Sequence, residues 1–263
     1  MSINPSSIPG VTLTPGNTVL KKQFFLTAGE TDVHGAMPLR LMAMRAIETA
    51  TDHSNILGIG YADLLPLGIG WVLARMTIDV ERYPAINETY SVSTWIESTN
   101  KFFSTRNHLV KDSRGNTCAR IISIWAAIDI KSRSRADLSV LDPKLFVSEP
   151  KKIEIRKLPV PPLTESLNPR SKTITFQYTD TDFNGHVNAV SYIMAAINLH
   201  DIPFYRKNRV RRLDITYEHE CHADLPVEIY HATLSDSPDE EIVELHDAGG
   251  NRMAALRIRH ISA

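Results

Sequence analysis

The sequence predicts an α+β fold built from two similar halves, each with strand-rich segments around one long helix. Three observations predict this fold. A short acidic loop motif occurs twice, an apolar pattern of helical period follows each copy, and alternating polar and apolar residues fill much of each half. The chain has 263 residues, of which 43% are hydrophobic and 22% charged. This ordinary globular composition excludes collagen, a coiled coil and wholesale disorder.

The repeat consists of three pairs of segments that occur in the same order in both halves. Glu30-Thr-Asp-Val-His-Gly-Ala36 matches Asp180-Thr-Asp-Phe-Asn-Gly-His186, residues 78–87 match 215–224, and residues 112–116 match 247–251. Any one match alone has no weight. Three matches with similar offsets indicate two homologous halves.

The elements of the two halves follow the same order. In the first half the patterns predict a strand over 24–27, a helix over about 38–56, and strands over 89–96 and 121–130. The second half has corresponding patterns, which predict a strand over 173–178, a helix over 189–199 and a strand over 227–234. Both helices are apolar over a wide face, as expected of a helix covered by a sheet. Residues 112–116 and 247–251 are typical of hairpin turns.

A proline-rich segment over 141–171 separates the halves. Repeated proline is incompatible with central strands and helix interiors, so we expect an extended surface linker. The predicted organisation is therefore an N-terminal half over 1–140, the linker over 141–171, and a C-terminal half over 172–263.

Charge and cysteine content narrow the function classes. The net charge of −1 argues against a whole-chain nucleic-acid role, and two cysteines without a Cys-x-x-Cys motif exclude a disulfide framework and a zinc ribbon. No apolar stretch approaches the roughly 20 residues that span a bilayer. The first 16 residues lack the pattern of a signal or transit peptide. We therefore expect a cytoplasmic protein that acts without a membrane, nucleic acid, cofactor or metal.

Chemically useful side chains are concentrated in the second copy of the repeat. The first half has Ala36 where the second has His186, and it has neither a carboxylate nor a thiol at the positions of Glu220 and Cys221. This asymmetry predicts one active half and one supporting half.

The residues of the second copy suit attack on a carbonyl group. The imidazole of His186 can transfer protons near neutral pH, and the amide of Asn184 can orient it or donate to an oxyanion. Glu220 can activate water, whereas Cys221 can act as a nucleophile if its thiolate is stabilised. Asp182 completes the group.

Other interpretations of these segments remain open. Residues 180–185 match the start of a calcium loop, but Ser191 occupies the twelfth position, where that loop needs a glutamate. His219 and His222 resemble metal ligands, yet strand alternation would point them to opposite faces. Without the repeat, Asn184 and His186 would more often be turn-capping residues than catalytic ones.

At these residues the chain resembles the acyl-acyl-carrier-protein thioesterases, the plant and bacterial enzymes that end fatty-acid elongation. The resemblance covers most of residues 23–261. In the first half, the matching segments are Trp71-Val-Leu-Ala-Arg75-Met and Arg82-Tyr-Pro84. In the second half, they are Asp182-Phe-Asn-Gly-His-Val-Asn188 and Tyr217-Glu-His-Glu-Cys221. The resemblance implies a tandem (double) hotdog, in which two curved antiparallel sheets each wrap around a long helix. It also implies hydrolysis of fatty acyl-ACP thioesters, with acyl carrier protein as the partner.

By the same resemblance, Asp182, Asn184, His186 and Glu220 form a hydrolytic network, with Cys221 as the alternative nucleophile. We favour activation of water by Glu220, because consecutive residues of an extended segment face opposite sides. A glycine stands before the histidine where many relatives have a polar residue, which leaves the substrate preference open.

An acyl chain needs an apolar slot, and an acidic carrier protein needs a basic docking surface. The residues expected to line the slot are Leu41, Met44, Ile47, Leu64, Leu65, Leu67 and Trp71. The residues expected to dock the carrier are Arg206, Lys207, Arg209, Arg211 and Arg212. Core packing of the first set and simple solvation of the second are the alternatives.

Two further functions remain as alternatives: an acyl-CoA thioesterase of the hotdog superfamily, and a non-catalytic acyl-binding or dehydratase-like module. The expected assembly is a monomer or a homodimer, because two fused halves already provide the pairing that single-hotdog proteins obtain by dimerising. We expect a bacterial cytoplasm.

Overall fold

The computed structural model describes residues 4, 7–149, 151–156 and 158–263. The chain divides into two compact units. Unit 1 comprises Met1–Ala74 and Val80–Ile155, and unit 2 comprises Arg75–Asp79 and Arg156–Ala263. Positions 1–3, 5–6, 150 and 157 of the predicted N-terminal half and linker lie outside the described residues. No helix in the described part of the chain is long and apolar enough to cross a membrane.

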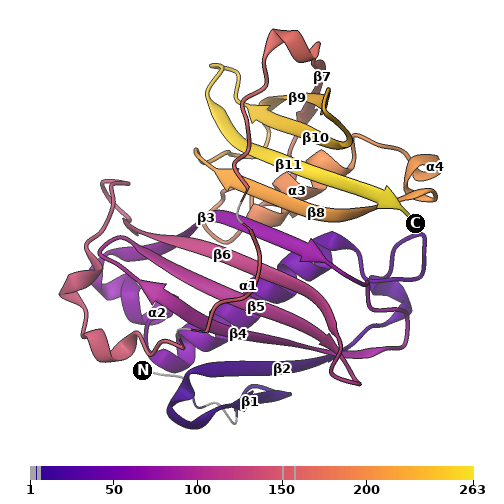
Figure 1. Ribbon diagram of the computed structural model, residues 1–263. Helices are drawn as coiled ribbons and strands as arrows, with labels where there is room; N and C mark the ends of the chain where they lie inside the picture. Colours follow the sequence, from indigo (N-terminus) through magenta and orange to yellow (C-terminus); the bar gives the residue numbers. More distant parts are fainter. Residues whose placement is uncertain (1–3, 5–6, 150, 157) are drawn as a thin grey trace. The chain divides into compact units, whose positions relative to one another are not determined.

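Unit 1 is an antiparallel sheet with one long helix. Its strands follow the order β1-β2-β4-β5-β6-β3, and the pairs from β1 to β6 are antiparallel. The helix α1 lies on one face of these strands (Figure 1). The bounds are β1 Val11–Leu13, β2 Val19–Phe25, α1 Leu39–Leu57, α2 Tyr61–Leu64, β3 Ile69–Val80, β4 Thr89–Thr99, β5 Phe103–Asp112 and β6 Thr117–Asp129.

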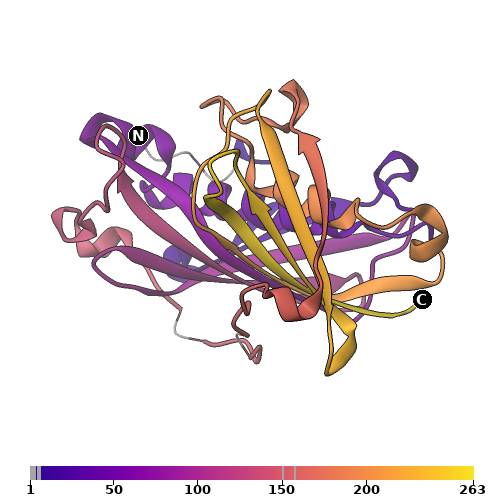
Figure 2. The same ribbon diagram turned by 90° about the horizontal axis from the view of Figure 1, so that it is seen from above.

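Unit 2 has the same plan with a shorter helix. Its strands follow the order β8-β11-β10-β9-β7, all paired antiparallel, and Arg75–Asp79 pairs antiparallel with β8. The strands twist relative to one another, and α3 lies on one face (Figure 2). The bounds are β7 Arg170–Thr175, α3 Ala189–Ile197, α4 Ile202–Tyr205, β8 Asn208–Tyr217, β9 Pro226–Leu234, β10 Ser237–His246 and β11 Arg252–Ser262.

The predicted repeat recurs in the backbone hydrogen bonds of the two units. Met37 N donates to Pro84 O, and Val187 N donates to Cys221 O in the equivalent place. Isolated antiparallel bridges join Ala36 to Ala85 and residue 186 to residue 222. The hairpin turns at 112–116 and 247–251 are closed in the same way. Each unit combines helix and antiparallel sheet, which confirms the α+β class. The equivalent hydrogen bonds in the two units confirm the repeat.

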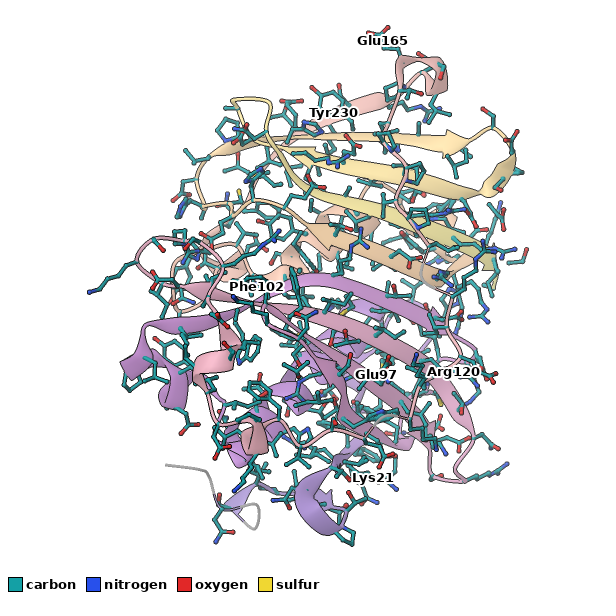
Figure 3. The ribbon with its side chains drawn as sticks, turned by 60° about the vertical axis from the view of Figure 1, so that its left-hand side comes forward. Lys21, Glu97, Phe102, Arg120, Glu165 and Tyr230 are labelled. Carbon is teal, nitrogen blue, oxygen red and sulfur yellow. The ribbon has the colours of Figure 1, made fainter. Side chains whose placement is uncertain are left out.

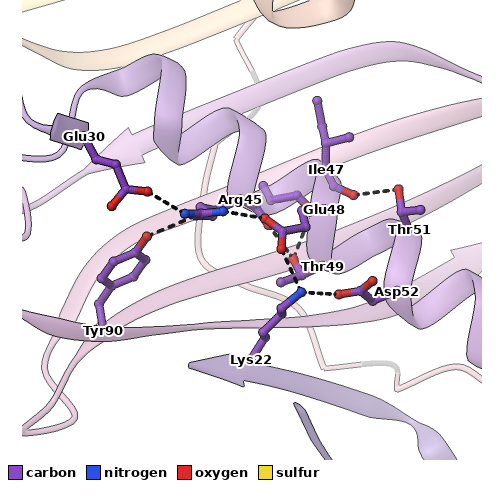
Figure 4. Close-up of polar contacts among 10 residues, drawn as sticks. Lys22, Glu30, Arg45, Ile47, Glu48, Thr49, Thr51, Asp52 and Tyr90 are labelled. Atoms are coloured by element: carbon purple, nitrogen blue, oxygen red, sulfur yellow. Dashed lines mark hydrogen bonds and ion pairs between the residues drawn. The ribbon is translucent and has the colours of Figure 1, made fainter. Parts of the chain in front are cut away.

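Helix α1 is fixed by packing on one side and by ion pairs on another. Leu41, Met42 and Ala46 are buried at helical spacing. On the polar side, Arg45 donates to Glu30 and Glu48 at 2.8 Å each, and Lys22 contacts Glu48 and Asp52 at 2.7 Å (Figure 4).

The segment predicted as a linker begins as part of unit 1. Lys151 O accepts hydrogen bonds from Trp95 Nε1 at 2.7 Å and from Asn107 Nδ2 at 3.1 Å, and the same amide donates to Glu97, labelled in Figure 3. Described residues 151–164 have no helix or strand. This part of the segment is therefore a connection without regular secondary structure.

The predicted helices agree with α1 and α3 to within about two residues, but two strand ends were wrong. The strands predicted to end at 27 and 178 end at Phe25 and Thr175. In each case the chain leaves the sheet for a short 3₁₀ helix, Ala28–Glu30 or Tyr178–Asp180. An acid at the third helical position satisfies the backbone N–H of the capping residue, which stops the strand.

Candidate active site

The loop before α3 is a tight turn organised by Asp182. Its Oδ1 accepts hydrogen bonds from Asn184 N at 2.8 Å and His186 N at 3.1 Å, while Asp182 N donates to His186 O. Gly185 adopts φ 77°, a conformation that favours glycine. This explains the glycine before the histidine.

The equivalent turn in unit 1 shows that the aspartate contacts are part of the loop structure. Asp32 Oδ1 accepts from His34 N at 2.9 Å and Ala36 N at 3.2 Å. A carboxylate with this bonding therefore occurs in a loop that has no imidazole at the equivalent of His186. Asp182 accordingly has a structural reason to be present, and its carboxylate positions the loop.

Asn188 joins this loop to α3. Its Oδ1 accepts from Val190 N and Ser191 N at 3.0 and 3.1 Å, which caps the helix. Its Nδ2 donates to Asp180 O at 2.7 Å. One side chain thus fixes both ends of the segment that carries His186.

The imidazole of His186 meets the carboxylate of Glu220. His186 Nε2 lies 3.6 Å from Glu220 Oε2, and their side chains are 23% and 40% exposed, so water reaches both. The ring of His222 packs edge-on against His186, with centroids 5.1 Å apart. Residues 186 and 220 are far apart in the sequence, and the fold brings them together. Asn184 is exposed on the same loop.

Glu220 and Cys221 lie in an irregular segment after β8 rather than in an extended strand. Strand β8 ends at Tyr217, because the N–H groups of Glu218 and His219 both turn to Met253 O. The two side chains nonetheless differ in accessibility, since Glu220 is exposed and Cys221 is only 4% exposed.

The thiol of Cys221 is poorly suited to ionise. Burial, together with the negative charge of Asp247, raises its pKa to about 11. Its Sγ lies 3.3 Å from His222 O, to which it donates. A thiol with this pKa is about one part in ten thousand thiolate at pH 7.

Two tyrosines missed by the sequence-based site prediction pack beneath the loop. Tyr217 Oη donates to Ala189 O at 2.9 Å, and its ring meets Tyr192 edge-on at 5.7 Å. Burial raises the pKa of both phenols, so they remain protonated donors. Tyr217 begins one of the family-like motifs, which was the available signal for this pair.

The apolar residues predicted to bind an acyl chain differ in their exposure to solvent. Leu64 and Trp71 pack in a core cluster with residues 136–141, and Trp71 Nε1 donates to Ile59 O. Leu41 is also buried, and Ile47 is partly buried. In contrast, Met44, Leu65 and Leu67 are exposed at 44%, 44% and 57%.

The basic run over 206–212 is partly neutralised. Arg211 forms an ion pair with Asp79, and Arg212 donates to Asp214 at 2.7 Å. Arg206 and Lys207, at the end of α4, are exposed, and Arg209 is partly buried. In the described part of the chain, the exposed side chains of Arg206 and Lys207 therefore offer the positive charge that a docking surface needs.

Among the described residues, His219 and His222 are not part of a group of side chains that could hold a metal ion. Such a group is formed by His200, Glu241 and His260. No local spacing in the sequence marks this group, because its three members are far apart along the chain.

Comparison with known proteins gives consistent results over most of the chain. The family model described as the acyl-ACP thioesterase N-terminal domain matches residues 17–140, and that of the acyl-ACP thioesterase C-terminal domain matches residues 164–259. A chloroplastic palmitoyl-acyl carrier protein thioesterase of Gossypium hirsutum is 25% identical over 239 residues, which cover 86% of this chain. The chain spans 58% of that relative's length. For a chloroplastic oleoyl-acyl carrier protein thioesterase of Arabidopsis thaliana, the identity is 24%, and the match covers 90% of this chain and 68% of the relative.

Solved structures show the same likeness. An acyl-ACP thioesterase from Bacteroides thetaiotaomicron aligns with a TM-score of 0.84 and 27% identity, over 95% of this chain and 100% of that one. The 12:0-ACP thioesterase of Umbellularia californica has a TM-score of 0.82 at 20% identity, covering 94% of this chain and 95% of its own, and supports the fold alone.

Proposed function

Because the chain belongs to the acyl-ACP thioesterase family, we propose that it hydrolyses the thioester that joins a fatty acyl chain to acyl carrier protein. The products are a free fatty acid and the carrier's thiol, so the reaction ends elongation of that acyl chain. The observation that carries the proposal is the meeting of His186 and Glu220 at 3.6 Å in a water-accessible place. Unit 1 has alanine at the position equivalent to His186.

Each unit is, in this proposal, one hotdog of a tandem pair. Support comes from the matching order of loop, helix and antiparallel strands, and from the equivalent hydrogen bonds at Met37 and Val187. Unit 2 is the catalytic half and unit 1 the supporting half.

Glu220 acts as the general base in the proposed mechanism. Its carboxylate takes a proton from water while the water oxygen bonds to the thioester carbonyl carbon. The exposed amide of Asn184 donates a hydrogen bond to the oxyanion that forms. Collapse of this intermediate breaks the carbon–sulfur bond, and the departing sulfur takes the proton from Glu220. His186 orients the carboxylate, and Asp182 positions the loop.

Cys221 does not act as the nucleophile in this proposal. An acyl-enzyme route needs a thiolate, and burial of Cys221 holds the thiol in its protonated form at neutral pH. Its side chain is buried, whereas that of Glu220 is exposed. The water route uses the accessible carboxylate of Glu220, whose side chain is 40% exposed.

The acyl chain binds, we propose, beside buried and partly buried apolar residues of α1, and the carrier docks on exposed basic residues. Leu41 and Ile47 are the candidates for the acyl slot, while Leu64 and Trp71 already have a packing role in the core. Arg206 and Lys207 are the candidates for docking. Arg211 and Arg212 contribute less because they have acidic partners.

The experiment that tests the function compares hydrolysis of acyl-ACP and acyl-CoA with the same acyl chain, over a series of chain lengths. We expect a higher kcat/KM on acyl-ACP, and a loss of about 10²–10⁴ in His186→Ala. Faster hydrolysis of acyl-CoA would indicate a CoA thioesterase instead. Binding of acyl chains without hydrolysis of either thioester would indicate an acyl-binding module.

A further inference from the structure

A second cluster of titratable side chains lies in unit 2, separate from the candidate active site residues. Glu241, which is 4% exposed, lies within hydrogen-bonding distance of two imidazoles. His200 Nε2 lies 3.0 Å from Glu241 Oε2, and His260 Nε2 lies 2.9 Å from Glu241 Oε1. The three donor groups are within 4.8 Å of one another.

The fold assembles this cluster from three neighbouring strands and the end of a helix. Glu241 lies on β10, and His260 on the adjacent strand β11, where it follows Ile258, the partner of Glu241, by two residues and so faces the same side. His231 on β9 faces the same side, with Nδ1 3.9 Å from Glu241 Oε2. Its neighbour Tyr230, labelled in Figure 3, faces the other side. His200 comes from the turn after α3.

We propose that His200, Glu241 and His260 form a binding site for a divalent transition metal of the zinc class. Imidazole nitrogen and carboxylate oxygen are both ligands of zinc, and three protein ligands with an open fourth position are a recognised arrangement. Zinc bonds of about 2.0–2.1 Å in a tetrahedron place neighbouring donor atoms roughly 3.3 Å apart. The Nε2 atoms of His200 and His260 lie 3.0 and 2.9 Å from the Glu241 carboxylate oxygens, and all three ligand atoms lie within 4.8 Å of one another. Small shifts of the side chains would bring these atoms to the tetrahedral spacing. His231 is the candidate for the fourth ligand.

The charge and packing of the cluster support a cation. Glu241 is only 4% exposed, and its two carboxylate oxygens face the Nε2 atoms of His200 and His260. A bound dication would compensate the charge of this buried carboxylate. Phe204 stacks on His200 with ring centroids 4.0 Å apart and meets His260 edge-on at 5.1 Å, so one aromatic ring packs against both imidazoles.

The affinity should be lower than that of a dedicated structural zinc site. Nδ1 of His260 is buried and has no hydrogen-bond partner among the described residues. A metal-bound imidazole usually donates its second N–H to an acceptor, and loss of such support costs about 10–100-fold in affinity. No step of thioester hydrolysis involves this site; its role is to hold the end of α3 and α4 to the sheet.

The test is titration of chelator-treated, full-length protein with zinc, followed by calorimetry and thermal unfolding. We expect one zinc per chain, a raised Tm, and an intense visible spectrum of tetrahedral type when cobalt replaces zinc. His200→Ala is the preferred variant, since its side chain is 24% exposed and the change is tolerable for folding. It should weaken zinc binding about tenfold or more, and Glu241→Gln should do the same.

The matched control is His246→Ala, which removes another histidine–glutamate contact on β10, the 2.9 Å pair with Glu244. This variant should keep the zinc affinity of the wild type. Absence of zinc binding in the wild type would overturn the proposal. Binding that persists in His200→Ala, or a cobalt spectrum of octahedral type in the wild type, would overturn it as well. None of these readouts depends on thioester hydrolysis.

Discussion

At the scale of single residues, burial distinguishes Glu220 from its neighbour Cys221, although the type of either side chain would suit attack on a thioester. Glu220 is exposed and close to His186, whereas Cys221 is buried and its pKa is raised to about 11. This difference favours activation of water by Glu220. The pKa of the Cys221 thiol lies about four units above pH 7, so its deprotonation at that pH is unfavourable. The assignment therefore rests on environment rather than on residue type.

This environment predicts slow chemical modification of Cys221. The reaction of iodoacetamide with the thiol should be slow at pH 7–8 and should rise about tenfold per pH unit until pH approaches 11, because only the thiolate reacts. The rate is measured by mass spectrometry in a Cys118→Ser background, with the unfolded chain as reference. An inflection near the ordinary thiol pKa of about 8.5 would refute this description of Cys221.

The sequence alone selected His186 and Glu220 for one site, and these residues lie 3.6 Å apart. Alternation in an extended segment would turn Glu220 and Cys221 to opposite faces, and the two side chains do differ in exposure. The irregular backbone that carries them arises because two consecutive N–H groups share Met253 O and end β8 at Tyr217. Such a bulge depends on a partner strand and has no local sequence signal.

At the scale of elements, the turn before α3 connects folding to function. Asp182 shapes the turn, and Asn188 caps the helix and also holds Asp180. The equivalent turn in unit 1 shows that the scaffold was predictable from the repeat. The His200–Glu241–His260 cluster was not, since strand register brings those residues together.

The Asn188→Ala variant tests this connection. Loss of the cap should cost about 0.5–2 kcal/mol of stability and should lower kcat/KM, because the loop that carries His186 loses its anchor. Thermal unfolding and steady-state kinetics measure the two effects. Asn198→Ala, an exposed position at the other end of α3, is the control and should change neither. Unchanged stability and activity in Asn188→Ala would show that Asn188 does not anchor the loop that carries His186.

At the scale of the whole molecule, local charge runs are poor guides to docking surfaces. Arg211 and Arg212 look like part of a basic patch, but they pair with Asp79 and Asp214. Asp79 is 132 residues away from Arg211 in the sequence, so the pairing could not be predicted from the run itself. The overall charge of −1 hides such local differences.

Charge reversal at Arg206 and Lys207 tests carrier docking. The double change to glutamate should raise KM for acyl-ACP about tenfold, with little change in kcat, and leave small thioesters unaffected. The same reversal at Arg170 and Lys172, which are exposed on β7, is the matched control. Equal effects of both double variants, or an effect on small thioesters, would argue against docking at 206–207.

The most direct measurement is kcat/KM on acyl-ACP for four variants at neutral pH. We predict losses of about 10²–10⁴ in Glu220→Gln and His186→Ala, and a substantial residual rate in Cys221→Ser. Glu218→Gln, which removes a carboxylate two residues away that pairs with Arg252, should retain the wild-type rate. Abolished activity in Cys221→Ser together with retained activity in Glu220→Gln would contradict the account.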